Sequence, residues 1–343
     1  MRVLVVTNMY PSPGNPFYGI FVQEQVHSLR AHGLIVDVLF IDGATSKLAY
    51  PISVSRLFQR LRHNHYDLIH AHHTYCVFPA RLAMALAGAR APLVLTFHEG
   101  EVHNAAFRPK GLKRLVFSKR LKRMALARAD LVITVQQALT EALAYPGDAQ
   151  TIPCGVDAAL FRPMDRTQCR RRLGLPLDRR IVFFPAARSN EQKGIHVLEQ
   201  ALARLNRPDV ELVAAGAIEH ERMPEWMNAA DVVCQLSLFE ASPMALKEAM
   251  AVNARVVFTD AGDALQIMGD TPGCYCCERS SKAVATALAS ALDDPRPART
   301  RARIIATGLS LDAVARRNIA AYRRLCGGAL PDQAARPLRD PTG

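Results

Sequence analysis

The chain has 343 residues, which at roughly 150 residues per domain predicts two domains. Hydrophobic residues make up 50% and charged residues 22%, a globular composition that excludes a disordered chain. The net charge is +12, and nine unopposed basic residues fall within residues 108–128, so one segment is suited to an anionic partner. The longest uncharged stretch, residues 3–23, is interrupted by Asn8, Pro11 and Pro16, so no membrane span is expected. The start lacks a signal-peptide pattern, which favours a cytoplasmic protein.

Short β-rich runs alternate with helical patterns along the whole chain. Because the predicted strands are continuously apolar, they indicate an α/β fold of parallel sheets with helices on both faces. The series stops and restarts around residues 153–163, which predicts two doubly wound, Rossmann-like domains, residues 1–158 and 159–311, facing across a cleft. Residues 331–343 are expected to form a disordered tail. The strands are predicted at 3–7, 36–41, 67–71, 93–97, 131–135, 181–185, 210–214, 231–235 and 254–258, and helices at 21–31, 81–86, 115–126, 195–205, 283–292 and 312–325.

Cysteine and histidine give little sign of a metal site. The eight cysteines hold one Cys-x-x-Cys pair, Cys274 with Cys277, and no second ligand cluster lies nearby. His70, His72 and His73 end one predicted strand, and three neighbouring side chains on a strand are expected to point different ways. The sequence therefore predicts no metal.

The strongest candidate site follows the predicted strand 231–235. Ser242 is expected to cap a helix whose first residue is Pro243. The free amides of Met244 and Ala245 would then suit a phosphate or sugar oxygen. Glu240 and Glu248 bracket this helix start, and carboxylates accept hydrogen bonds from hydroxyls, so a nucleotide sugar would satisfy the whole set. The alternative is a loop charge at Glu240 and a solvated helix face at Glu248.

Other candidates lie on loops after predicted strands. Arg188 and Lys193 follow the first strand of the second domain, where two cations suit a diphosphate or are simply solvated. Gly19 precedes the first helix, where it either lets the backbone approach a phosphate or serves only the turn. His98 ends the strand 93–97 and either faces the cleft or is a hydrogen-bonded structural histidine.

These motifs, taken in order, resemble glycosyltransferase family 4, whose members have the GT-B fold. Glu240 and Glu248 are spaced as in the E-x7-E motif of that family. The resemblance covers residues 1–325 and departs from the family pattern at Ala187, Cys154 and Asn253. Further similar segments are residues 6–11 with 19–21, residues 151–157 with 161–163, Arg188 with Lys193-Gly194, residues 230–233 and residues 255–257.

The resemblance implies a retaining glycosyltransferase that uses a nucleotide diphosphate sugar without a metal or other cofactor. It implies that Glu248 holds the ribose, that Glu240 and the backbone around residues 242–245 hold the donor sugar, and that Arg188 and Lys193 neutralise the leaving diphosphate. Gly19 would let the first domain close on the phosphates, and His98 would touch the sugar near the reacting carbon. The helix 312–325 is expected to cross back onto the first domain.

The acceptor implied is a saccharide or a lipid-linked saccharide. In residues 108–128, Leu115 and Leu121 interleave with cations in a helical pattern, so this segment either docks on anionic lipid of the inner membrane face or is a solvated helix face. Two other functions stay open: a nucleotide-sugar epimerase of GT-B architecture, and a non-enzymatic protein that binds an anionic polymer through this segment. Nucleic acid is not expected, because only Phe107 and Phe117 could stack on bases there.

Overall fold

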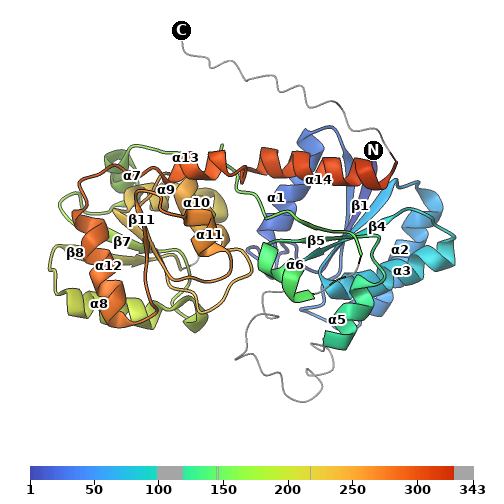
Figure 1. The fold of residues 1–343 in the computed structure, drawn as a ribbon, viewed down its shortest axis with the longest axis horizontal. Helices are drawn as coiled ribbons and strands as arrows, with labels where there is room; N and C mark the ends of the chain where they lie inside the picture. The colour runs from blue at the N-terminus through green and yellow to red at the C-terminus, as the bar shows by residue number, and fades with distance from the viewer. Residues whose placement is uncertain (99–118, 144, 146, 217, 328–343) are drawn as a thin grey trace, which may run out of the picture.

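Two parallel β-sheets lie side by side along the long axis of the molecule (Figure 1). The computed structural model describes residues 1–98, 119–143, 145, 147–216 and 218–327. The first sheet has six strands in the order β2-β1-β3-β4-β5-β6, and the second has five in the order β11-β10-β9-β7-β8. This architecture confirms the predicted α/β fold with two doubly wound sheets. Residues 108–118 of the basic segment and the tail 331–343 lie outside the described residues.

The elements alternate along the chain as the sequence predicts. Strands are β1 (Arg2–Thr7), β2 (Ile35–Phe40), β3 (Leu68–His72), β4 (Leu93–Phe97), β5 (Leu131–Thr134), β6 (Ala149–Thr151), β7 (Arg180–Phe184), β8 (Val210–Ala214), β9 (Val232–Gln235), β10 (Val256–Phe258) and β11 (Cys274–Cys276). Helices are α1 (Ile20–Ala31), α2 (Ala49–His63), α3 (Thr74–Ala87), α5 (Lys119–Leu126), α6 (Gln137–Leu143), α7 (Arg166–Leu173), α8 (Ile195–Leu205), α9 (Met223–Ala229), α10 (Met244–Ala251), α11 (Ala264–Met268), α12 (Ser281–Asp293), α13 (Thr300–Ala306) and α14 (Leu311–Leu325), with single 3-10 turns at Glu191–Lys193 and His220–Arg222.

Burial on both faces explains why the strands are continuously apolar. In β1, Leu4 and Val6 pack with Leu57 of α2 and with α3 and α5, whereas Val3 and Val5 pack on the other face with α1 and α14. In the second sheet, one face of β7 packs on α8 and α12, and the other face packs on α9, α10 and α13. Each sheet is therefore a layer between two layers of helices, as parallel sheets require.

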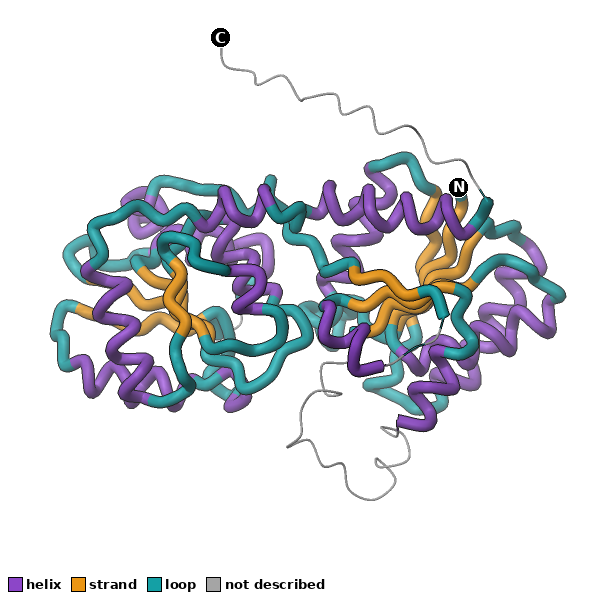
Figure 2. The backbone as a smooth tube through the Cα atoms, viewed as in Figure 1, coloured by secondary structure: helices purple, strands orange, loops and turns teal. Residues whose placement is uncertain are grey.

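Two chain segments cross between the sheets next to each other. Val156 N donates to Leu309 O at 2.9 Å, and Leu311 N donates to Val156 O at 2.8 Å. Gly155 allows this approach, because a Cβ there would lie 2.9 Å from Cα of Leu311. From this crossing α14 runs back along the first sheet and packs on α1, with Tyr322 fully buried (Figures 1 and 2).

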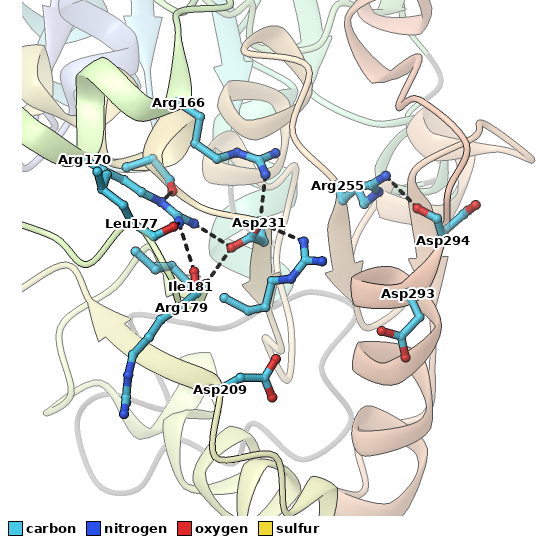
Figure 3. A network of polar contacts seen from close by, with 12 residues as sticks. Arg166, Arg170, Leu177, Arg179, Ile181, Asp209, Asp231, Arg255, Asp293 and Asp294 are labelled. Carbon is cyan, nitrogen blue, oxygen red and sulfur yellow. Dashed lines mark hydrogen bonds and ion pairs between the residues drawn. The ribbon is translucent and has the colours of Figure 1, made fainter.

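A buried carboxylate anchors the far end of the second sheet (Figure 3). Asp231 immediately precedes β9 and is 4% exposed. It accepts hydrogen bonds from Arg166 Nη1 at 2.8 Å, from Arg170 Nη2 at 2.6 Å and from the backbone N of Ile181 at 2.7 Å. The contacts tie α7 to β7 and β9, at the edge of the sheet opposite the carboxyl ends of its strands.

Some elements differ from the prediction. The helix expected at residues 81–86 begins at Thr74 and contains Pro79, because Cys76, Val77 and Ala80 are buried and this apolar contact outweighs one lost backbone hydrogen bond. The strands β6 and β11 were not predicted, since each has three residues and lies at a sheet edge without a strongly apolar pattern. In the part of the chain that the structure describes, no helix is long and apolar enough to cross a membrane.

Candidate active site

A cavity of about 340 Å³ lies where the carboxyl ends of the two sheets face each other. Ligands of open α/β sheets bind at this end of the strands. Six of the nine predicted site residues line it, namely His98, Lys193, Glu240, Ser242, Met244 and Ala245. The other lining residues are Met9, Phe21, Val135 and Cys154 from the first sheet side and Gln192, Phe239 and Ala241 from the second. The cavity thus joins loops from both sheets.

Lys193 and Glu240 form an ion pair on the second-sheet side of this cavity. Lys193 ends the short turn after β7, and Glu240 lies on the loop after β9, so neighbouring strands bring them together. Glu240 also accepts a hydrogen bond from Ser237 Oγ at 2.7 Å. The two side chains are mostly buried, 27% and 16% exposed, so their charges face the cavity with little screening.

The start of α10 differs from the prediction. The helix begins at Met244 with Pro243 as its N-cap, and Ser242 does not cap it. Ser242 Oγ instead donates to Asp263 Oδ2 at 2.8 Å and accepts from Lys247 Nζ at 2.7 Å. These buried partners compete successfully for the hydroxyl because the alternative would leave charged groups unpaired. The helix N-terminus still lies at the cavity, lined by Met244.

Lys247 is a site residue that the sequence reasoning missed. It is fully buried, and its Nζ donates to the carbonyl of Cys154 at 2.8 Å as well as to Ser242. Burial lowers the pKa of Lys247. This side chain joins the loop before α10 to the chain that leaves β6, so it fixes the two sides of the cavity relative to each other. The sequence did offer one signal for Lys247, because it is a lysine directly before Glu248 in an otherwise apolar helix.

Glu248 lies in α10 behind the cavity wall and is 7% exposed. Its pKa is raised to about 7, mainly by burial and also by the charge of Glu24, while the charges of His220, Lys193 and Lys247 oppose the shift. Glu24 and His220 come from the two halves of the molecule and form an ion pair, with His220 Nε2 at 3.0 Å from Glu24 Oε1. Burial lowers the pKa of His220, but the carboxylates of Glu24 and Glu248 raise it overall. Sequence reasoning did not single out Glu24 or His220.

The raised pKa of Glu248 has a measurable consequence for stability. The folded state keeps the Glu248 proton up to a pH of about 7, whereas the unfolded chain loses it near 4.5, so this group lowers stability as the pH rises between those values. We expect Glu248→Gln to stabilise the protein at pH 8, on the order of a few kcal/mol, and much less at pH 5. Thermal unfolding at both pH values measures this. The exposed Glu278→Gln should show no such pH-dependent gain, and an equal gain in both variants would contradict the assignment.

Arg188 and Gly19 do not line the cavity in this structure. Arg188 forms an ion pair with Glu199 of α8, and both side chains are about half exposed, 55% and 47%. Gly19 precedes α1 with a φ of 78°, and a Cβ there would lie 2.2 Å from the backbone C of Met9. The close packing against the first loop therefore requires glycine whether or not a ligand approaches.

Histidines in and directly after β3, together with His98 after β4, meet beside the cavity. His70 and His72 are two residues apart and share a face of β3, with ring centroids 4.2 Å apart, so the expectation that these side chains point different ways was wrong for this pair. His73 has a φ of 78° and lies at the N-cap of α3. His98 contacts Phe21, with ring centroids 5.0 Å apart, and its pKa lies well below the usual value because of burial. Burial lowers the pKa of His70 and His72 as well, so His70, His72 and His98 are neutral at physiological pH.

Among the described residues, no group of three or more His, Cys, Asp or Glu side chains is arranged to hold a metal ion. Cys274 and Cys277 are free thiols, and burial raises the pKa of each. Among the residues that line the cavity, Lys193 carries the positive charge.

The chain matches two family models. Residues 2–160 match Glycosyltransferase Family 4 and residues 215–309 match Glycosyl transferases group 1. A curated relative is the putative teichuronic acid biosynthesis glycosyltransferase TuaC of Bacillus subtilis, 27% identical over 353 residues that cover 84% of this chain and 88% of TuaC.

Solved structures share the fold. Sucrose-phosphate synthase from Thermosynechococcus elongatus superposes with a TM-score of 0.79 at 20% identity, covering 95% of this chain and all of that chain. HepE from Anabaena in complex with UDP superposes with a TM-score of 0.69 at 19% identity, covering 94% of this chain and all of that chain.

The two facing sheets have the GT-B fold of these structures. Within that fold, the chain belongs to glycosyltransferase family 4, the group 1 glycosyltransferases, because the two family models together match both halves of the chain, and it resembles bacterial polysaccharide-type members.

Proposed function

We propose that this glycosyltransferase moves a sugar from a nucleotide diphosphate sugar to a hydroxyl of a saccharide or lipid-linked acceptor, with retention of configuration and without a metal. The observation that carries the proposal is the cavity between the sheets, where Lys193, Glu240 and the start of α10 face His98 across the domain boundary. A UDP-sugar is the first donor to test, because the structural neighbour HepE is described in complex with UDP and with UDP-glucose.

The roles follow from the chemistry of the donor. Glu248 holds the ribose hydroxyls and Glu240 a donor-sugar hydroxyl, because a carboxylate accepts hydrogen bonds from both. The amides at Met244 and Ala245 face the donor at a helix start, where the partial positive charge suits phosphate or sugar oxygens. This arrangement requires the ionised form of Glu248, so donor affinity should weaken as the pH falls below about 7.

Lys193 neutralises the charge that develops on the leaving diphosphate, the task that a metal ion performs in other enzymes. In this structure Lys193 pairs with the carboxylate of Glu240, and a phosphate of the bound donor would replace that carboxylate as its partner. Arg188 can bind the diphosphate only after its side chain leaves Glu199. We therefore propose that it does so in a closed state of the enzyme, in which Gly19 also approaches the phosphates.

The reaction is a front-face displacement. The acceptor oxygen bonds to the anomeric carbon on the side from which the diphosphate departs, the carbon–phosphate oxygen bond breaks, and the acceptor proton passes to the leaving phosphate oxygen. The products are the glycosylated acceptor and a nucleoside diphosphate. After a donor phosphate has replaced Glu240 beside Lys193, the hydrogen bond from Ser237 still holds Glu240 as a hydrogen-bonding group, which favours this path over a covalent intermediate on Glu240.

The acceptor side lies on the first domain, and we propose that residues 108–128 bring the enzyme to anionic lipid on the inner membrane face. The described part of this segment, α5, exposes Arg120 and Arg123 and the apolar Met124. Flotation with vesicles that contain anionic lipid should carry the protein in low salt, and Arg120→Gln with Arg123→Gln should reduce flotation. Equal flotation with neutral vesicles would contradict docking by charge.

The test of the reaction is acceptor-dependent release of nucleoside diphosphate. The enzyme is incubated with UDP-glucose and other nucleotide sugars, with and without EDTA, and with extracted bacterial glycolipids, and the nucleotide is separated by anion exchange. We expect release with one nucleotide class, unaffected by EDTA, and an axial product linkage by NMR when the donor linkage is axial. A requirement for a divalent ion, an inverted linkage or conversion of the donor without acceptor would each contradict the proposal.

A further inference from the structure

Three imidazoles lie in a row from the body of the first domain to the cavity, and the first two, His70 and His72, are buried. His70 is hydrogen-bonded at both ring nitrogens, to Tyr322 Oη at 2.7 Å and to Thr96 Oγ1 at 2.6 Å. His72 stacks beside it, and His72 Nδ1 lies 3.0 Å from Nε2 of His98, with the two rings only 15° from parallel. His98 is the last of the three and lines the cavity.

One proton lies between His72 and His98, and the surroundings of His72 show which ring carries it. His72 is 1% exposed, and no described residue forms a hydrogen bond with its Nε2. A buried N–H without an acceptor is rarer and costlier than a buried lone pair without a donor. We therefore assign the His72 proton to Nδ1, from which it would be donated to Nε2 of His98.

That hydrogen bond fixes the other ring. Since Nε2 of neutral His98 accepts a hydrogen bond, its proton must be on Nδ1. Cys154 Sγ lies 3.9 Å from this Nδ1. Burial raises the pKa of Cys154 to about 11, so the sulfur belongs to a neutral thiol and is a weak acceptor. A ligand oxygen that enters the cavity can replace it.

We propose that His72 is a positioning residue that holds His98 in the Nδ1–H form, so that His98 presents a hydrogen-bond donor to the ligand in the cavity. A donor at this place suits a sugar hydroxyl or the oxygen on which charge develops during transfer. The inference rests on the proposed function for its catalytic consequence, whereas the protonation pattern of the two rings is a property of the free protein.

The direct test is NMR of protein labelled with ¹⁵N-histidine, in which long-range ¹H–¹⁵N correlations distinguish the two neutral forms of each ring. The His98 signals are assigned by their loss in His98→Gln. We expect the Nδ1–H form of His98 in the wild type and in His72→Asn, because the asparagine amide can donate from the place of Nδ1. We expect loss of that preference in His72→Phe. An Nε2–H form in the wild type, or an unchanged form in His72→Phe, would overturn the proposal.

Kinetics separates positioning from folding. His72→Phe should lower kcat by about 10–100-fold, the usual effect of removing a group that orients a reactive histidine, with the donor KM little changed. His72→Asn should recover most of that loss. The exposed His196→Asn on α8 serves as the matched control and should match the wild type. An equal loss in His72→Asn and His72→Phe would contradict positioning by a hydrogen bond.

The two proposals fail in different ways. If the enzyme transfers no sugar but His98 has the expected Nδ1–H form, the proposed function is wrong and the pairing of His72 with His98 stands. If transfer occurs but His72→Phe keeps full activity, the reaction stands and the positioning role is wrong. Thermal unfolding of each variant shows whether a lost activity reflects a lost fold.

Discussion

Lys193→Met should lower kcat about 10²–10³-fold, the effect of removing one group that stabilises charge in a transition state. Lys193 supplies the positive charge at the cavity, beside Glu240 and next to the start of α10. Methionine keeps most of the length and volume of the side chain but cannot offset the charge of the leaving diphosphate. The measurement is the steady-state rate of nucleoside diphosphate release at saturating donor.

Lys282→Met is the matched control, since Lys282 is exposed on α12 and does not line the cavity. It should leave kcat unchanged. Removing Lys193 also leaves Glu240 without its cation, so thermal unfolding of both variants is needed to show that the protein is folded. A Lys193→Met enzyme with more than about a third of the wild-type rate would contradict the assigned role.

Asp231→Asn should lower the free energy of unfolding by about 3–5 kcal/mol, because breaking a buried ion pair leaves the opposite charge without a partner. Asp231 is 4% exposed and the Arg170 side chain 6% exposed, so water cannot solvate the guanidinium left behind (Figure 3). Asparagine preserves the shape of the side chain and isolates the loss of charge. Urea denaturation followed by circular dichroism measures the change.

Asp209→Asn provides the control within the same domain. Asp209 pairs with Arg207, but its side chain is 45% exposed, so the substitution should cost much less stability than Asp231→Asn. The Asp231 network lies away from the cavity and joins α7 to the strands, so Asp231→Asn should affect kcat only where it unfolds the protein. Equal losses of stability in the two variants would contradict the proposal that the buried Asp231 ion pair stabilises the second domain.

Much of the fold could be predicted because the parallel strands are buried on both faces. In β1 every residue from Val3 to Val6 is fully buried, which produces the uninterrupted apolar run that marks a strand of this kind. The short edge strands β6 and β11 lack that signal, and their place depends on pairing with distant neighbours. Pro79 misled the prediction of α3, since local preference was outweighed by burial of the surrounding residues.

Candidate site residues could be predicted where polar or charged side chains of a motif directly follow a predicted strand. Lys193 and Glu240 were both predicted on loops after strands, and the neighbouring strands β7 and β9 bring them together at the cavity, a contact that the sequence did not predict. The sequence could not predict the contacts made between distant segments. Ser242 bonds to Asp263 and Lys247 instead of capping α10, and only the fold makes those two side chains available.

The histidines illustrate the same limit. The pattern at residues 70–73 did not predict the contact with His98, because that contact depends on the register of β3 beside β4. Glu24 and His220 are 196 positions apart in the chain, and their ion pair exists only because the two domains face each other. Residues such as these carry no local signal of their role.

The most direct test of the account is whether a nucleotide diphosphate sugar binds through Glu248. Thermal shift is measured with UDP-, GDP-, ADP-, dTDP- and CMP-sugars, with and without EDTA, on the wild type and on Glu248→Ala, each compared with its own ligand-free unfolding temperature. A ligand that binds the folded state raises that temperature. We expect one nucleotide class to stabilise the wild type equally with and without EDTA, and we expect Glu248→Ala to lose this effect. Stabilisation that vanishes with EDTA, or that survives in Glu248→Ala, would contradict it.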